Sequence, residues 1–254
     1  MESIDYHSAM AMLAWQVELG CDECTADVPV NLYEIPSLAP KTDQGSEAKP
    51  VLASEPVCID PISLGHVAAE RAQDLAGLRE GLESFKHCDL RRGARNLVFA
   101  DGIPGARVMI IGDPPSREED REGRPFVGGA GELLDKMLSA IDLSRKSSVY
   151  LINVIPWRPP QNRDPKPDEI NMIQPFLKRH IDLAKPDVLV VMGNQSCKIL
   201  LGSHSNMSLR GNWGELFDKP VLPMLHPTYL LRNPTAKRET WDDLLSLKMR
   251  LSEI

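Results

Sequence analysis

The chain has 254 residues, of which 42% are hydrophobic and 26% charged. That length can bury one well-formed core and predicts a single domain with an additional segment. No apolar run approaches the ~20 residues that a membrane span needs. The acidic residues Glu2 and Asp5 stand where a secretory signal would be basic. We therefore expect a soluble, cytoplasmic protein with no membrane partner.

The net charge of −7 argues weakly against a nucleic acid partner, but this charge is unevenly distributed. Residues 1–60 hold two basic and eleven acidic side chains, and the remainder hold 27 basic and 25 acidic ones. The acidity thus belongs to the N-terminal segment, and the rest of the chain is free to present a basic face.

Within that segment, residues 6–20 predict a short amphipathic helix that ends at Gly20. Residues 27–62 are rich in Pro, Ser, Asp and Glu without sustained periodicity, which is typical of a linker. We expect residues 1–62 to form an acidic helix plus linker, and residues 63–254 to form the functional domain.

Five cysteines do not form the even set of a disulfide framework. Cys21 and Cys24 have the spacing of a metal or redox pair, but no second pair accompanies them. We interpret them as two thiols near the end of a helix.

The rest of the chain alternates short apolar runs with helical patterns. Residues 64–84 show helical spacing, and further helices are predicted at 130–141, 167–184, 194–201 and 236–252. Strands are predicted at 108–111, 149–155, 188–192 and 221–225. Such alternation indicates an α/β fold with a four-stranded parallel sheet covered on both faces, whose strands all end at one edge.

Chemically capable side chains follow these strands. Asp113 comes after the first strand, Asn153 near the end of the second, and His226 after the fourth. Taken singly, each has a structural explanation as a turn, cap or loop residue. Their convergence on the edge where open α/β sheets bind ligands favours a functional site.

Three segments near this edge suggest a ligand with a backbone and a flat ring. Residues 123–131 are rich in glycine and carry the aromatic Phe126, but they lack the ATP-binding pattern of a phosphate loop. Phe126 is equally well explained as a core anchor. The basic, proline-braced loop 157–165 and the segment 226–232 are suited to holding a nucleic acid backbone and wedging between bases.

Three sequences carry a specific resemblance: GDPPSREEDREGRPFVGGAGELL, INVIPWRPPQNRDP and HPTYLLRNPTAKR. In this order they resemble the motifs of the family-four uracil-DNA glycosylases, and the similarity extends over residues 85–250. The resemblance implies helices on both sides of a four-stranded parallel sheet, and an enzyme that flips uracil out of DNA and hydrolyses its glycosidic bond. A monomer acting on uracil-containing DNA and releasing free uracil is expected.

The resemblance also implies roles for particular residues. Asp113 would position the attacking water and stabilise the sugar cation, and His226 would stabilise the departing uracil anion. The residues expected to bind uracil are Gly112, Glu119, Phe126 and Asn153, where Phe126 stacks on the base, Asn153 reads its edge and Glu119 rejects thymine. The residues expected to bind DNA are Arg158, Arg163, Pro227, Thr228, Leu231 and Arg232.

The sequence departs from this family in two places. The catalytic motif reads Gly112-Asp-Pro-Pro-Ser116, with Asp in place of Glu and Ser in place of Gly. The four positions that bind an iron–sulfur cluster in the family correspond to Phe85, Cys88, Trp157 and Ile173. Because one thiolate cannot hold a cluster that takes four, we expect no cofactor and apolar packing in its place.

Two alternatives to an active uracil glycosylase follow from the altered motif. The chain could bind uracil or abasic sites in DNA without cutting, or it could remove another deaminated base such as hypoxanthine. The presence of the carboxylate, the amide and the imidazole together favours catalysis over binding alone. Among the possible bases, Asn153 favours uracil.

Overall fold

The computed structural model describes residues 60–202 and 206–254, and in addition Met10 and Trp15. Residues 1–55 form one unit and residues 56–254 a second. Met10 and Trp15, which belong to the helix predicted at 6–20, are helical, whereas Cys21, Cys24 and nearly all of the predicted linker lie outside the described residues. The boundary predicted at residue 62 stays a prediction.

The second unit is built on a six-stranded sheet. Its strands are β1 (Asp101–Gly102), β2 (Val108–Gly112), β3 (Val149–Asn153), β4 (Val188–Met192), β5 (Gly214–Leu216) and β6 (Lys219–Met224). They lie in the order β1-β3-β2-β4-β6-β5. The four central strands are parallel, which confirms the predicted parallel sheet, and β1 and β5 add short antiparallel edges.

Twelve helical segments within residues 60–202 and 206–254 surround the sheet or connect its strands. The shorter ones are α4 (Leu90–Gly93), α5 (Arg117–Glu122), η1 (Pro160–Asn162), α9 (Asn206–Leu209), α10 (Pro227–Arg232) and η2 (Pro234–Ala236). The longer ones, apart from α2 and α3, are α6 (Gly128–Ser139), α7 (Pro167–Ala184), α8 (Asn194–Leu201) and α11 (Lys237–Glu253).

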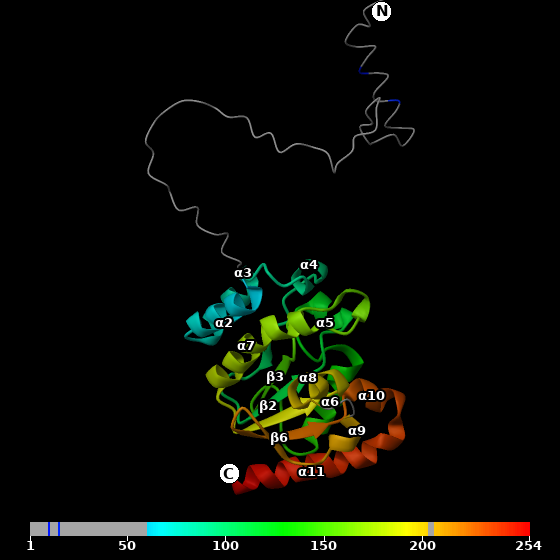
Figure 1. Cartoon of the computed structure of the whole chain (residues 1–254). Helices are drawn as coiled ribbons and strands as arrows, with labels where there is room; N and C mark the ends of the chain where they lie inside the picture. Colours follow the sequence, from blue (N-terminus) through cyan, green and yellow to red (C-terminus); the bar gives the residue numbers. More distant parts are fainter. Residues whose placement is uncertain (1–9, 11–14, 16–59, 203–205) are drawn as a thin grey trace, which may run out of the picture. The chain divides into compact units, whose positions relative to one another are not determined.

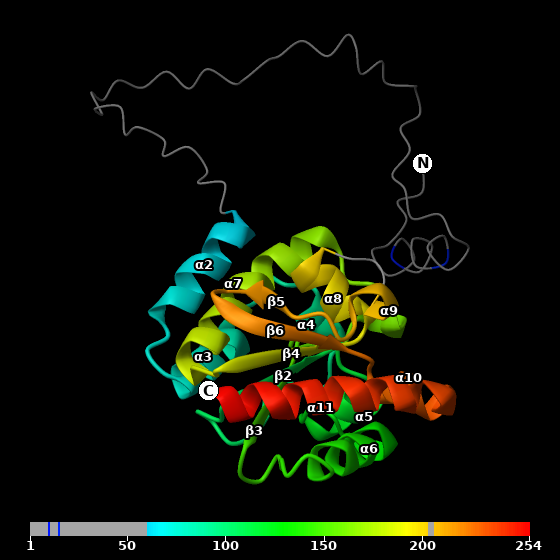
Figure 2. The ribbon, with the colours of Figure 1, turned by 90° about the horizontal axis from the view of Figure 1, so that it is seen from below.

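Alternation along the strands gives the sheet two apolar faces. Met109 and Ile111 of β2 belong to one core cluster, together with residues of α2, α3, α7 and α8. Val108 and Ile110 belong to the other, together with residues of α6 and α11. In Figure 1 the strands lie between α2, α3 and α7 above and α11 below, and Figure 2 shows the same layers from the side of α11. Helices therefore cover both faces, as the unbroken apolar strands require.

The helix predicted at 64–84 is two helices, α2 (Pro61–Arg71) and α3 (Leu75–Ser84). The break has a local cause and a tertiary one. The Asp74 side chain accepts the backbone N–H of Gly77 at 2.7 Å and caps the start of α3. The Ala72 carbonyl accepts two hydrogen bonds from the guanidinium of Arg179 on α7, at 2.7 and 3.0 Å.

No helix of residues 60–202 or 206–254 is both long and apolar enough to cross a membrane.

His180, on α7, is enclosed in the core between that helix and the sheet. His180 is 5% exposed, its ring stacks on Phe99 at 4.5 Å, and its Nε2 lies 3.0 Å from the hydroxyl of Tyr150. Burial lowers the pKa of His180 from 6.5 to about 3, so the folded state holds this imidazole neutral.

This burial predicts a pH dependence of stability. Because the folded pKa lies below the unfolded one, the stabilisation is complete above pH 6.5 and is lost as the pH falls toward 3. We expect the wild-type free energy of unfolding to decrease by up to about 1.4 kcal/mol per pH unit below pH 6.5, relative to His180→Gln. Chemical denaturation of both proteins between pH 8 and pH 5 measures this difference. Parallel pH profiles would contradict a neutral, buried His180.

Candidate active site

A cleft of about 610 Å³ lies at the carboxyl ends of the parallel strands. Seven of the twelve predicted site residues line it: Asp113, Glu119, Phe126, His226, Thr228, Leu231 and Arg232. The other five do not: Gly112, Asn153, Arg158, Arg163 and Pro227. A carboxylate, an aromatic ring and an imidazole thus share one cavity, although more than a hundred residues separate the first from the last.

Asp113 follows β2 and is held by the start of α8. Its Oδ1 accepts the backbone N–H of Ser196 at 2.9 Å and lies 3.1 Å from the Ser196 hydroxyl. The N-terminal end of a helix carries partial positive charge, which suits a carboxylate. Gly193, just before α8, has a φ of +118°, and a Cβ there would lie 2.2 Å from the Asp113 carboxyl atoms. Both the helix end and this glycine therefore fix where the carboxylate lies.

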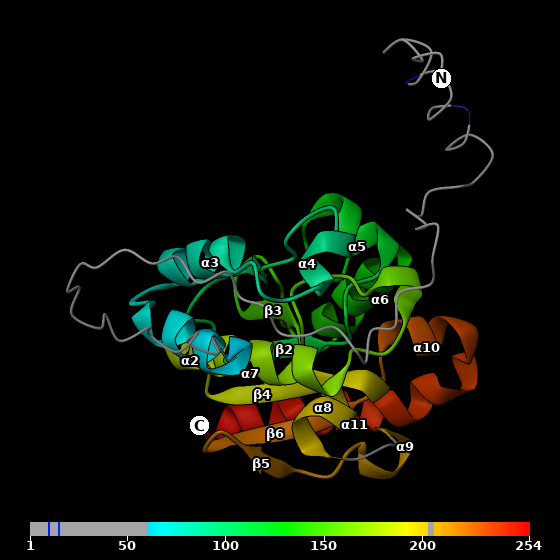
Figure 3. The ribbon, with the colours of Figure 1, turned by 45° about the horizontal axis from the view of Figure 1, so that its top comes forward.

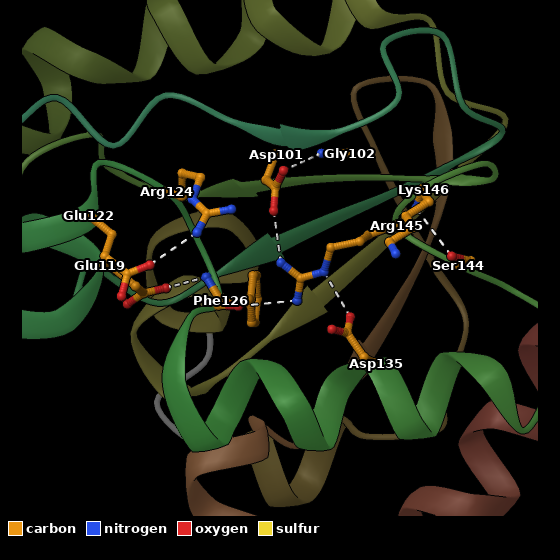
Figure 4. Close-up of polar contacts among 10 residues, drawn as sticks. All are labelled: Asp101, Gly102, Glu119, Glu122, Arg124, Phe126, Asp135, Ser144, Arg145 and Lys146. Carbon is orange, nitrogen blue, oxygen red and sulfur yellow. Dashed lines mark hydrogen bonds and ion pairs between the residues drawn. The ribbon is translucent and has the colours of Figure 1, made fainter.

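Phe126 is held in an unusual backbone conformation from both sides. Its φ is +50°, a value that an aromatic residue rarely adopts. Glu119 Oε1 accepts its N–H at 2.6 Å, and Arg145 Nη2 donates to its carbonyl at 3.1 Å. Figure 4 shows the Arg145 guanidinium reaching the Phe126 carbonyl while it also binds two carboxylates. Those are Asp101, at 2.8 Å, and Asp135, at 2.7 Å.

Two glycines make room for this arrangement. A Cβ on Gly112 would lie 2.6 Å from the ring of Phe126, and one on Gly131 would lie 2.0 Å from its carbonyl oxygen. Gly112 does not line the cleft, so its contribution in the structure is to let the Phe126 ring pack against the end of β2. Phe126 is 2% exposed and its ring lies nearly parallel to His226, with centroids 5.5 Å apart.

Glu119 has both oxygens occupied in the structure. Oε2 accepts the backbone N–H of Ser116 at 2.7 Å, while the Ser116 hydroxyl accepts the N–H of Glu119 at 3.3 Å. This reciprocal pair is the capping box that starts α5. Since Oε1 binds Phe126, Glu119 links the start of α5 to the aromatic ring. Its predicted contact with the C5 side of a pyrimidine stays a prediction.

His226 is the N-cap of α10, and its tautomer follows from that position. Its Nδ1 accepts the backbone N–H of Thr228 at 3.2 Å, and the Thr228 hydroxyl lies 3.0 Å away. Because a backbone N–H can only donate, Nδ1 is unprotonated and the proton of the neutral ring is on Nε2. Burial lowers the pKa of His226, while the negative charges of Asp113 and Glu119 act to raise it. The site therefore contains a neutral imidazole with an N–H donor at Nε2.

Asn153 lies beside the cleft rather than in its wall. It pairs with Gly112 in the register of β2 and β3, and it is 6% exposed. Its Nδ2 donates to the carbonyl of Asp113 at 2.6 Å. Among the described residues, its Oδ1 is buried and has no hydrogen-bond partner. A buried acceptor without a partner is costly in a folded protein and suggests that a ligand donor completes it.

The residues predicted to bind DNA divide into two groups. Leu231 is 48% exposed and lines the cleft with Thr228 and Arg232, on α10. Pro227 is the buried first residue of that helix. Arg158 and Arg163 are engaged within the protein: Arg158 donates to Asn162 at 2.8 Å, and both terminal nitrogens of Arg163 donate to Glu169, at 2.8 and 2.5 Å. DNA contacts by Arg158 and Arg163 stay predictions.

Two residues near the site were not found from the sequence. Ser196 binds Asp113 across 83 positions, and Arg145 binds Phe126 and Asp101 across 19 and 44 positions. Ser196 is the third residue of the helix predicted at 194–201, which begins just after Gly193, and a side chain in the first turn of that helix could have been considered. Arg145 lies in a connection without any pattern.

The fold and the cleft define an α/β protein whose site joins an acid, an aromatic ring and a neutral imidazole at the carboxyl edge of a parallel sheet. The profile of the Uracil DNA glycosylase superfamily matches residues 99–245. The chain therefore belongs to the uracil-DNA glycosylase superfamily.

Relatives of type 4 resemble it over most of their length. The type-4 uracil-DNA glycosylase of Sulfurisphaera tokodaii is 35% identical over 184 residues, which cover 68% of this chain and 83% of that relative. The type-4 uracil-DNA glycosylase of Thermotoga maritima is 39% identical over 159 residues, which cover 61% of this chain and 81% of that relative. The type-4 enzyme of Archaeoglobus fulgidus is 33% identical, with 63% of this chain and 84% of that relative covered.

The tautomer of His226 is directly measurable. We expect long-range ¹H–¹⁵N NMR spectra at pH 7 to show a neutral ring protonated on Nε2, and a protonation midpoint below the ordinary 6.5 because of burial. A proton on Nδ1, or a midpoint above 6.5, would contradict the cap geometry and its electrostatic consequence. His66 and His87, both exposed, give separate ring signals for comparison in the same spectra.

Proposed function

We propose that this chain is a uracil-DNA glycosylase that hydrolyses the bond between a flipped-out uracil and its deoxyribose, leaving an abasic site in DNA. The observation that carries the proposal is that Asp113 and His226 line the same cleft, so that an anion and an N–H donor face one bound nucleotide. Membership of the superfamily and the three type-4 relatives support it.

The chemistry follows from these two groups. As the bond between N1 of uracil and C1′ of the sugar breaks, its electron pair leaves with the base and positive charge develops on the sugar. The Asp113 carboxylate stabilises that charge and takes a proton from the water that adds to C1′. His226 Nε2–H donates to O2 of the departing uracil anion, where negative charge accumulates. Donors and charges fixed before the reaction stabilise such a transition state without reorganising.

The choice of uracil rests on Asn153. Its unpartnered Oδ1 can accept the N3–H of uracil, and the second hydrogen of its amide can reach O4. Cytosine has no hydrogen at N3 and presents a donor at position 4, so both interactions would fail. Each unmet buried bond costs about 1–3 kcal/mol, or a factor of roughly 5–150. Phe126, clamped through its backbone, would supply the ring on which the base stacks.

Removal of uracil is tested by single-turnover cleavage of labelled oligonucleotides that carry U·G, U·A, single-stranded U, T·G or hypoxanthine. We expect the wild-type chain to act on uracil, and Asn153→Ala to retain DNA binding but lose most excision for lack of its base-reading amide. Asp113→Asn is expected to slow bond cleavage as well, because it removes the charge opposite the sugar.

Binding of uracil DNA without cleavage would favour the non-catalytic alternative, and preference for hypoxanthine would favour the other-base alternative. Rates for both variants within about twofold of wild type, or about 0.4 kcal/mol, would contradict the site assignment.

We also propose that this chain works without an iron–sulfur cluster. The four positions that correspond to the family's ligands are Phe85, Cys88, Trp157 and Ile173, which are 5%, 0%, 2% and 2% exposed and belong to one apolar cluster. Burial raises the pKa of the Cys88 thiol to about 11, so it is held as a neutral thiol. A phenyl ring, an indole, an aliphatic side chain and one neutral thiol do not fit a cluster that binds four thiolates.

Packing at these positions should then carry stability. We expect Trp157→Ala to lower the free energy of unfolding by about 3–5 kcal/mol, the range for removal of a large buried aromatic. Cys88→Ser should have little effect on stability and none on activity. Iron and sulfide analysis of anaerobically purified full-length protein provides the independent test. Stoichiometric iron that disappears on substitution of Cys21, Cys24 or Cys88 would contradict the proposal.

A further inference from the structure

A second cleft, of about 770 Å³, lies between α3, α4 and α5. Figure 3 shows α4 and α5 next to each other at the same end of the molecule. Arginines from three elements line this cleft, and two glutamates accompany them. The basic residues are Arg79, Arg91, Arg95 and Arg121, and the acidic ones are Glu83 and Glu122. We call it the arginine cleft.

Two of these arginines have no acid to neutralise them. Arg79 pairs with Glu83 at 2.9 Å, and Arg121 lies 3.6 Å from Glu122. Within the described part of the chain, neither Arg91 nor Arg95 forms an ion pair. A guanidinium with free donors is well suited to phosphate, which it can bind through two N–H groups at once.

The backbone that carries Arg95 is bound to α5. The buried carboxylate of Asp120, on α5, accepts the backbone N–H groups of Arg95 and Asn96 at 2.8 and 3.2 Å. The Asn96 amide donates in return to the carbonyls of Asp120 and Arg121, at 2.7 and 3.0 Å. These bonds join the segment after α4 to α5, so an anion bound there would order little additional backbone.

The arginine cleft and the candidate active site share one helix. Arg117, Glu118 and Glu119 of α5 line the active-site cleft, whereas Arg121 and Glu122 of the same helix line the arginine cleft. A helix of six residues is about 9 Å long. Successive phosphates of one strand advance by about 3.4 Å along duplex DNA. A strand with one nucleotide in the active site would therefore pass the arginine cleft about three phosphates away.

We propose that the arginine cleft binds backbone phosphates of the uracil-bearing DNA strand, on one side of the flipped nucleotide, through Arg91 and Arg95. This inference rests on the proposed function and adds a DNA contact that the sequence did not indicate. It also gives a role to two unpaired arginines on a protein in which two of the three arginines predicted to bind DNA, Arg158 and Arg163, are bound to neighbouring side chains.

The salt dependence of DNA affinity measures these contacts. The full chain, R91A/R95A and the control K248A/R250A are titrated with a labelled, uracil-free duplex at several salt concentrations. The control removes the same charge from α11, close to Leu251. The Leu251 carbonyl accepts a hydrogen bond from Arg107, which precedes β2, so this part of α11 lies at the edge of the sheet opposite the active-site cleft. We expect R91A/R95A to reduce the slope of log K against log salt by about 2, and R91K/R95K to restore most of it.

Equal slopes for wild type and R91A/R95A would overturn the proposal, and so would an equal loss in K248A/R250A, since that would reflect overall charge. If R91A/R95A melts at a lower temperature than wild type, the salt dependence is measured instead for the single variant Arg95→Ala, because Arg95 is exposed. The slope of log K against log salt is then expected to fall by about 1. These measurements need no excision, so they stand even if the chain releases no uracil.

The position of the contact is tested with flanking length. Single-turnover excision at subsaturating enzyme is compared for wild type and R91A/R95A on single strands whose 5′ or 3′ flank is shortened one nucleotide at a time. We expect the variant's defect to vanish when one particular flank falls below about three nucleotides, and to persist when the other is shortened. A defect that is independent of both flanks would place the arginines off the strand, as for binding of a free anion or an acidic peptide, and would overturn the proposal.

Discussion

The backbone hydrogen bonds between β2 and its two neighbours fix where Asp113 and Asn153 lie. In the parallel register, Gly112 pairs with Asn153 of β3 on one side and with Met192 of β4 on the other. The three strands therefore end at the same level, and Asp113, the residue that follows β2, lies between the Asn153 amide and the N-terminus of α8. A shift of one residue in either pairing would turn the side chains of that strand to the other face of the sheet.

The same part of the structure holds the acid that replaces a longer one. Asp113 has one methylene less than the Glu expected in the family motif, so its carboxylate cannot reach as far from β2. Two features hold the shorter side chain in place: α8 supplies the Ser196 N–H, and Gly193 lets the carboxyl group approach the helix end without a clash. The position of the acid is thus set by the helix as much as by its own strand.

Sequence reasoning found the parts of the fold that have local periodicity. The four parallel strands and helices α7 and α8 lie within a few residues of where the apolar pattern predicted them. It did not find α10, because a six-residue helix capped by His226 has no repeated apolar face. The position of the Phe126 ring could not be predicted from the sequence for another reason. The ring's place depends on a positive φ that Glu119 and Arg145 maintain from distant segments, and no local pattern encodes such contacts.

Charge was the property that composition described least well. The value of −7 sums the whole chain, but a bound phosphate interacts mainly with charges within a Debye length, about 8–10 Å at physiological salt. Beyond that distance the acidic residues of segment 1–60 are largely screened unless that segment approaches the DNA. Residues 86–95 hold Lys86, Arg91, Arg92 and Arg95 against a single acid, Asp89. A strand near residues 86–95 would therefore encounter a locally cationic segment on an acidic protein, which is why net charge alone is a poor guide to nucleic acid binding.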